Sequence, residues 1–249
     1  MKIKRLVICA GATVTAMAWP VKAFAQTASC PQFMGEAKSL FLVLAPNATA
    51  TTATVSHFSR DDSTKPWRKQ GPSRLAVLGS RGTGWHQTFR SAAPGGAPIK
   101  AEGDKRTPLG IFRLGSSFGR GPGATATAPH VDLAKTDTVC VDDLASPDYG
   151  KVAPRSSLPA GTKGEAMSKE ALYRRGLIIE APADRTTKTG SCIFFHVWRG
   201  EDRPTAGCVA LAEQDVAHLQ AQARPDTVVA ILPRGDLHRF AACLPSSAD

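Results

Sequence analysis

The sequence contains no pair of cysteines at the Cys-x-x-Cys spacing. Structural zinc sites usually take their thiolate ligands at that spacing, so this absence argues against such a site. The sequence also has no internal repeat and no basic stripe interleaved with aromatic residues. Its positive charges are scattered, in pairs such as Arg174-Arg175. We therefore expect no bound metal, no cofactor and no nucleic-acid partner.

Beyond its first 25 residues, the chain lacks any apolar run long enough to cross a bilayer. Residues 1–25 resemble a secretory signal peptide, with a basic start, an apolar run from residue 6 to about 20, and a small-residue cleavage site at 23–25. An uncleaved anchor is the alternative. Cleavage removes four basic residues and lowers the formal net charge from +10 to +6. We expect a monomeric periplasmic or secreted protein of the cell envelope, with no stable membrane insertion after cleavage. A mildly basic charge suits an acidic envelope polymer.

Segments rich in β-branched and aromatic residues alternate with Gly- and Pro-rich stretches. They predict one mainly-β domain of sandwich or barrel type with a few short helices. One helix is expected from Ser168 to Gly176. A second is expected from residue 212, with Val216 and Leu219 on one face. The expected strands are roughly 39–45, 52–59, 74–79, 109–114, 176–181, 191–198 and 227–232.

The stretch CIFFHVWRGEDRPTAGCVAL, residues 192–211, contains a histidine and a cysteine twelve positions apart. Its first part reads as a strand, so Cys192, Phe194, His196 and Trp198 share one face. Cys192 and His196 are then about 13 Å apart, too far to bind one metal ion. The following loop can fold back and bring Cys208 beside His196. Three interpretations of the pair are then open: a nucleophile with its base, a metal site, or two ordinary core residues.

Several local features favour the nucleophile interpretation. Gly207 lets a substrate carbonyl approach the backbone, and the N–H groups of Gly207 and Cys208 are candidate oxyanion donors. The helix from residue 212 is expected to lower the thiol pKa through its positive end. A backbone carbonyl is expected to hold the His196 ring, and Asp202 is the acidic alternative.

Two motifs resemble those of the L,D-transpeptidase catalytic-domain (YkuD-like) family. HVWRGEDRPTAGCVAL resembles the family's histidine followed by Ser/Thr-x-Gly-Cys, and AEGDKRTPLGIFRLG (101–115) resembles its upstream Gly-Asp-Gly-Lys-Thr-Pro-x-Gly segment. The resemblance covers roughly residues 39–233. It implies a β-sandwich-like fold with a capping segment over the cleft, and an enzyme that acts on peptidoglycan stem peptides. Such an enzyme releases D-alanine, holds the rest as a thioester and passes it to an amine.

The resemblance assigns Cys208 as nucleophile, His196 as general base and Gly207 to the oxyanion site. The sequence departs from the family at Ala206, where a basic residue or histidine is usual, and at Ala210, where an arginine is usual. The further expected substrate contacts are Trp198, Arg199, Arg203 and Thr205, with Arg199 or Arg203 replacing the missing arginine. The alternatives are a non-catalytic peptidoglycan-binding module, or a hydrolase of the same fold.

Export also bears on the cysteines. Cys9 leaves with the signal, and the odd number that remains leaves at least one thiol free. With Cys208 kept free, we expect Cys30 to pair with Cys243 and Cys140 with Cys192, although four cysteines allow three connectivities. The expected organisation is a signal peptide (1–25), an N-terminal extension (26–38), a catalytic domain (39–233) and a disulfide-tethered C-terminal extension (234–249).

Overall fold

The computed structural model describes residues 29–123 and 129–246, so the predicted signal peptide and Cys9 lie outside the described residues. Within those ranges no helix has the length and apolar character needed to span a membrane. The strands are β1 (Ser39–Ala45), β2 (Thr52–Ser59), β3 (Arg68–Lys69), β4 (Arg74–Val77), β5 (Thr83–Trp85), β6 (Thr107–Gly119), β7 (His130–Asp132), β8 (Thr138–Cys140), β9 (Val152–Pro154), β10 (Glu165–Ala166), β11 (Arg175–Glu180), β12 (Phe194–Val197), β13 (Val209–Leu211) and β14 (Thr227–Pro233). The helices are α1 (Glu213–Gln222) and the 3-10 turns η1 (Gln32–Gly35), η2 (Gln87–Ala92), η3 (Arg155–Ser157), η4 (Met167–Lys169), η5 (Ala171–Arg174) and η6 (Arg234–Phe240).

The main sheet closes on itself. Its strands follow the order β1-β14-β6-β11-β12-β13-β4-β2, and β2 pairs back with β1. Every residue of β1 and β14 is buried, as expected for continuous apolar runs in central strands. The enclosed side chains form the main core. The predicted mainly-β domain with few short helices is confirmed.

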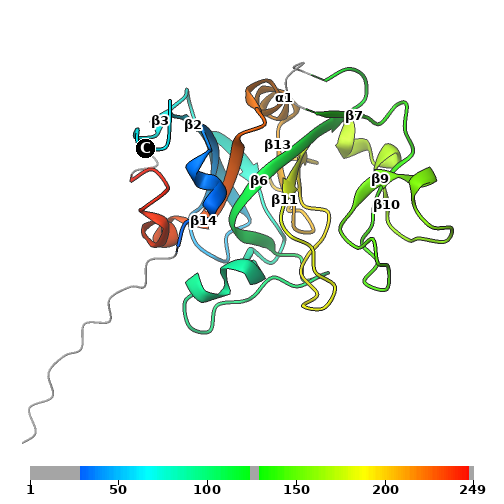
Figure 1. Cartoon of the computed structure of the whole chain (residues 1–249), viewed down its shortest axis with the longest axis horizontal. Helices are drawn as coiled ribbons and strands as arrows, with labels where there is room; N and C mark the ends of the chain where they lie inside the picture. The colour runs from blue at the N-terminus through cyan, green and yellow to red at the C-terminus, as the bar shows by residue number, and fades with distance from the viewer. Residues whose placement is uncertain (1–28, 124–128, 247–249) are drawn as a thin grey trace, which may run out of the picture.

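A smaller sheet lies to one side of the closed sheet, on the right of Figure 1. It has the order β10-β8-β9, and η4 and η5 follow it in the chain. We call residues 138–174 the cap. A disulfide between Cys140 in the cap and Cys192, just before β12, joins the cap to the main sheet. The cap is therefore attached covalently next to the strand that carries His196.

A second disulfide joins the two ends of the described chain. Cys30, before η1, bonds to Cys243, after η6, across a sequence separation of 213 residues. The Trp67 indole N–H donates to the Cys243 carbonyl at 2.9 Å and fixes the same region to the sheet. Both disulfides have the pairings expected from the sequence.

The predicted helix over 168–176 is wrong. The backbone of Glu170 is extended between η4 and η5, and its carboxylate caps the Leu172 N–H at 3.0 Å. Gly176 does not end a helix; it lies in β11 opposite His196, where an added Cβ would come within 2.1 Å of the Phe118 ring. The helix expected from residue 212 is present as α1, and Val216 and Leu219 are buried as predicted.

The strand expected over 191–198 is shorter than predicted. β12 covers only Phe194–Val197. Cys192 has a φ of 55°, in the left-handed region, so the alternation of side chains does not extend back to it. This backbone turn directs the Cys192 carbonyl toward the Cys208 sulfur, as described below.

Candidate active site

Two parallel neighbouring strands bring His196 and Cys208 together. β12 pairs with β13, with Phe195 opposite Val209 and His196 opposite Ala210. Cys208 directly precedes β13 and lies two residues before Ala210, so its side chain projects to the same face as His196. Both line a cavity of about 170 Å³. The other lining residues are Glu165, Glu170, Leu172, Tyr173, Trp198, Arg199, Arg203, Pro204, Thr205, Ala206 and Ala210.

Cys208 is the free cysteine among the described residues. Its Sγ lies 3.3 Å from the Cys192 carbonyl oxygen, to which the thiol donates. Burial raises the pKa of the Cys208 thiol to about 12, and the charge of Glu165 also raises it. The Phe194 backbone N–H and the charge of Lys100 lower the pKa of the thiol. The predicted lowering by the helix end is wrong, because β13 intervenes before α1 begins and burial dominates. The Cys208 side chain is therefore a neutral thiol near neutral pH.

The His196 ring is buried, and its Nδ1 lies 2.8 Å from the Val197 carbonyl oxygen. A carbonyl can only accept, so Nδ1 carries the proton and Nε2 is left as the basic nitrogen. Burial lowers the pKa of His196, while the Val197 carbonyl and the charge of Glu170 oppose that shift. A backbone carbonyl orients the ring, as expected from the sequence. The side chain of Asp202 is 82% exposed and lies 3.9 Å from Arg203.

Two threonine hydroxyls hold the backbone at Cys208. Thr205 Oγ1 donates to the Cys208 carbonyl at 2.7 Å, and Thr107 Oγ1 donates to the same oxygen at 3.4 Å. Thr205 Oγ1 also accepts the Gly207 N–H at 3.0 Å. The Gly207 N–H is therefore bonded to Thr205 in this structure, and its expected role at an oxyanion site stays a prediction. Gly207 has a φ of 148°, and an added Cβ would lie 3.0 Å from the Arg106 carbonyl, so this turn requires glycine.

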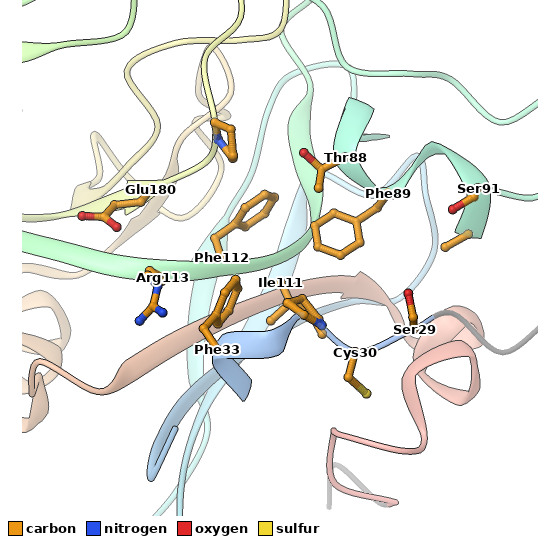
Figure 2. Close-up of a pocket in the computed structure, with 13 residues that line it drawn as sticks. Ser29, Cys30, Phe33, Thr88, Phe89, Ser91, Ile111, Phe112, Arg113 and Glu180 are labelled. Atoms are coloured by element: carbon orange, nitrogen blue, oxygen red, sulfur yellow. The ribbon is translucent and has the colours of Figure 1, made fainter. Parts of the chain in front are cut away.

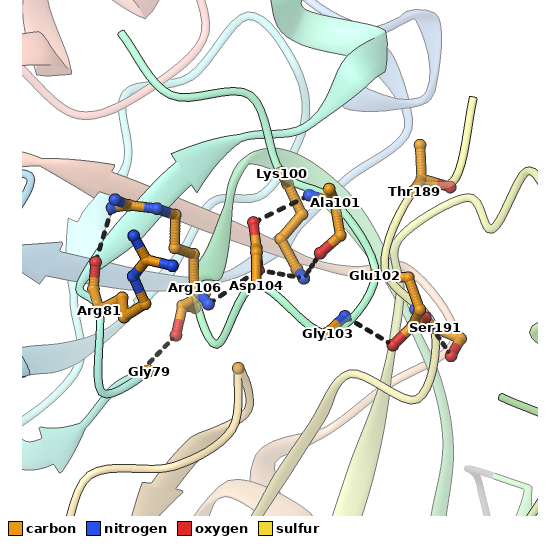
Figure 3. A network of polar contacts seen from close by, with 12 residues as sticks. Gly79, Arg81, Lys100, Ala101, Glu102, Gly103, Asp104, Arg106, Thr189 and Ser191 are labelled. Atoms are coloured by element: carbon orange, nitrogen blue, oxygen red, sulfur yellow. Dashed lines mark hydrogen bonds and ion pairs between the residues drawn. The ribbon is translucent and has the colours of Figure 1, made fainter.

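A partly buried polar network connects the upstream motif to the turn before Cys192 (Figure 3). The side chain of Lys100 is 3% exposed and its Nζ lies 2.7 Å from Asp104 Oδ1, which also accepts the Arg106 N–H at 2.9 Å. Glu102 Oε2 accepts the backbone N–H and the hydroxyl of Ser191, at 2.9 and 2.8 Å. The network thus joins the start of the 101–115 motif to the turn that precedes Cys192.

The expected substrate contacts Trp198, Arg199, Arg203 and Thr205 all line the cavity with Cys208. The family resemblance predicted a capping segment over the cleft, but the sequence did not identify the residues that form its wall. Tyr173 packs edge-on against the His196 ring with centroids 5.4 Å apart, and its hydroxyl donates to Glu165 Oε2 at 2.8 Å. Neither residue lies in a recognisable motif. The cap residues of this wall are Glu165, Glu170, Leu172 and Tyr173.

A second cavity, of about 410 Å³, lies under the N-terminal extension (Figure 2). Phe33, Phe89, Ile111 and Phe112 surround it, with Arg113 and Glu180 at one end. Its sulfur belongs to Cys30, which is held in a disulfide, and its lining contains no histidine. This cavity shares no lining residue with that of Cys208.

The comparison with protein families agrees with the motifs. The family model of the L,D-transpeptidase catalytic domain matches residues 72–231, a range that includes His196 and Cys208. No curated protein matches the chain. Among solved structures, the helical cell shape determining protein Pgp2 from Campylobacter jejuni matches with 15% sequence identity and a TM-score of 0.38, over 81% of this chain and 52% of that chain. The chain spans about half the length of that protein.

Proposed function

Because this chain belongs to the L,D-transpeptidase catalytic domain family, we propose that it is a cysteine acyl transferase that acts on peptidoglycan stem peptides. Cys208 is the nucleophile and His196 is its general base. The placement of both side chains on one face of adjacent strands, in one cavity, carries the proposal.

The charge states of the two residues define the first step. The thiol is neutral and Nε2 of His196 is a free base, so the imidazole takes the thiol proton as Sγ attacks the carbonyl carbon. In the proposed substrate, this carbonyl joins diaminopimelate to the terminal D-alanine. The imidazolium then gives its proton to the leaving amine, and D-alanine departs from the thioester. The Cys208 N–H supplies the oxyanion contact, since the Gly207 N–H is already bonded to Thr205.

The second step transfers the acyl group. An acceptor amine attacks the thioester carbon, His196 removes the amine proton, and that proton returns to the departing sulfur. A new amide forms and the thiol is restored. Arg199 and Arg203, on the loop between the catalytic residues, take the place of the arginine that the family usually has at position 210 and bind substrate carboxylates.

The remaining assignments follow from this chemistry. We propose that the protein is exported and works at the cell envelope as a monomer, after removal of residues 1–25. Two disulfides suit an oxidising compartment. Residues 39–233 are the catalytic domain, and the Cys30–Cys243 bond ties residues 26–38 to residues 234–249.

The test is mass spectrometry of muropeptides after incubation with the purified wild-type protein and with Cys208→Ala. We expect the wild type to release D-alanine and to produce amide-linked dimers, and the variant to produce neither. Release of D-alanine without dimers would identify a hydrolase. Unchanged muropeptides together with no acylation by a carbapenem would identify a binding module.

A further inference from the structure

Glu165 is held in the active-site cavity by the fold of the cap. It lies opposite Cys140 in the pairing of β10 with β8, and Cys140 is bonded to Cys192. The Tyr173 hydroxyl donates to Glu165 Oε2 at 2.8 Å, and the Tyr173 ring packs against His196. A strand pairing, a disulfide and a hydrogen bond therefore place this carboxylate in the cavity of Cys208.

Without substrate, the negative charge of Glu165 is itself unfavourable and also disfavours a thiolate at Cys208. Glu165 is half-buried, and no described Lys or Arg forms an ion pair with it. Burial, the largest cause, and the charge of Glu170 raise the pKa of Glu165, although the Tyr173 hydrogen bond opposes this shift. Its negative charge also disfavours a thiolate at Cys208. A partly desolvated charge without a counter-ion is costly, and a cation supplied by the substrate removes that cost.

We propose that Glu165 is a specificity-determining residue that binds the ammonium group of the diamino acid next to the scissile bond. The inference rests on the proposed function, which supplies a donor whose side chain ends in an ammonium and a carboxylate on one carbon. Glu165 takes the ammonium, and Arg199 and Arg203 of the same cavity take the carboxylate. Binding of the cation also neutralises the charge that disfavours the thiolate.

Two donor peptides test this assignment. One is the stem tetrapeptide that ends in meso-diaminopimelyl-D-alanine, and the other is the same peptide with the side-chain amine acetylated and therefore neutral. With the full chain, Glu165→Gln is expected to lower kcat/KM for D-alanine release from the first peptide by about ten- to fiftyfold, as for loss of a charged hydrogen bond. It is expected to change the rate with the acetylated peptide by less than about twofold.

Controls separate recognition from folding and from the proposed function. Glu165→Gln is expected to be acylated by a carbapenem at least as fast as the wild type, because the catalytic pair is intact and a repelling charge is gone. Glu165→Asp keeps the charge and is expected to keep a preference for the free-amine donor. Glu201→Gln, on the loop but outside the cavity lining, is expected to behave as the wild type.

Equal losses by Glu165→Gln on both donors, slower acylation by the carbapenem, or no loss on either donor would each overturn the assignment of Glu165. A wild-type protein that neither releases D-alanine nor reacts with the carbapenem would instead overturn the proposed function.

Discussion

The two cavities differ in size and in chemistry, and the smaller one contains the reactive groups. The larger, about 410 Å³, is surrounded by aromatic rings under the N-terminal extension, and its sulfur is held in a disulfide. The smaller, about 170 Å³, contains a free thiol, an imidazole with one free nitrogen, two carboxylates and two arginines. Volume follows from how an extension packs over a sheet, whereas reactivity requires convergent polar groups. The smaller cavity is therefore the better candidate for catalysis.

The strongest test of this comparison removes one side chain from each cavity. Cys208→Ala and His196→Ala are each expected to slow acylation by a carbapenem by about three orders of magnitude or more, because they remove the nucleophile or its base. Ser91→Ala in the larger cavity is expected to change the rate less than about twofold, since Ser91 has no place in the mechanism. Intact-protein mass spectrometry follows the adduct. If Cys208→Ala is still acylated, a residue other than Cys208 is the nucleophile.

The two disulfides sharpen the comparison, because Cys30 lines the larger cavity, whereas the carbonyl of Cys192 contacts Cys208 of the smaller one. The double variants Cys140→Ser/Cys192→Ser and Cys30→Ser/Cys243→Ser each open a long loop and are each expected to lower the free energy of unfolding by about 2 to 5 kcal/mol. Only the first pair holds the cap against Cys208, so only its loss is expected to slow acylation, by several-fold. Urea titration and adduct formation measure the two effects. Equal slowing in both variants would show that stability alone controls the rate.

The smallest effects concern the orientation of His196. Burial lowers the pKa of His196 below its usual 6.5, so the fall in acylation rate with decreasing pH is expected to lie below that value. Asp202→Asn is expected to leave the rate and its pH profile unchanged within about twofold, because Val197 supplies the acceptor for Nδ1. Rates from pH 4 to 8 provide the measurement. A loss already at pH 7, or a shifted profile in Asp202→Asn, would favour a carboxylate-oriented triad.

The sequence predicted the strands that are defined by local pattern, and it failed where distant packing decides. Branched and aromatic residues that recur between turn formers located β1, β2 and β14, and the position of Cys208 after a glycine indicated a candidate nucleophile. The helix predicted from Ser168 gave way to two 3-10 turns, because Tyr173 packs on Phe118, Phe194 and His196, all of which are distant in sequence. The proposed role of Glu165 depends on its pairing with Cys140, a contact that no local pattern encodes.

The neutral thiol of Cys208 also affects how readily that cysteine is oxidised. Oxidants, alkylating agents and disulfides react with thiolates far faster than with thiols, and a pKa of about 12 keeps the thiolate fraction very small near neutral pH. A thiol of this kind resists oxidation, although it contacts the carbonyl of Cys192, whose sulfur is part of a disulfide. Inhibitors that acylate Cys208 with His196 as the base are therefore expected to label Cys208 faster than general thiol reagents such as iodoacetamide do.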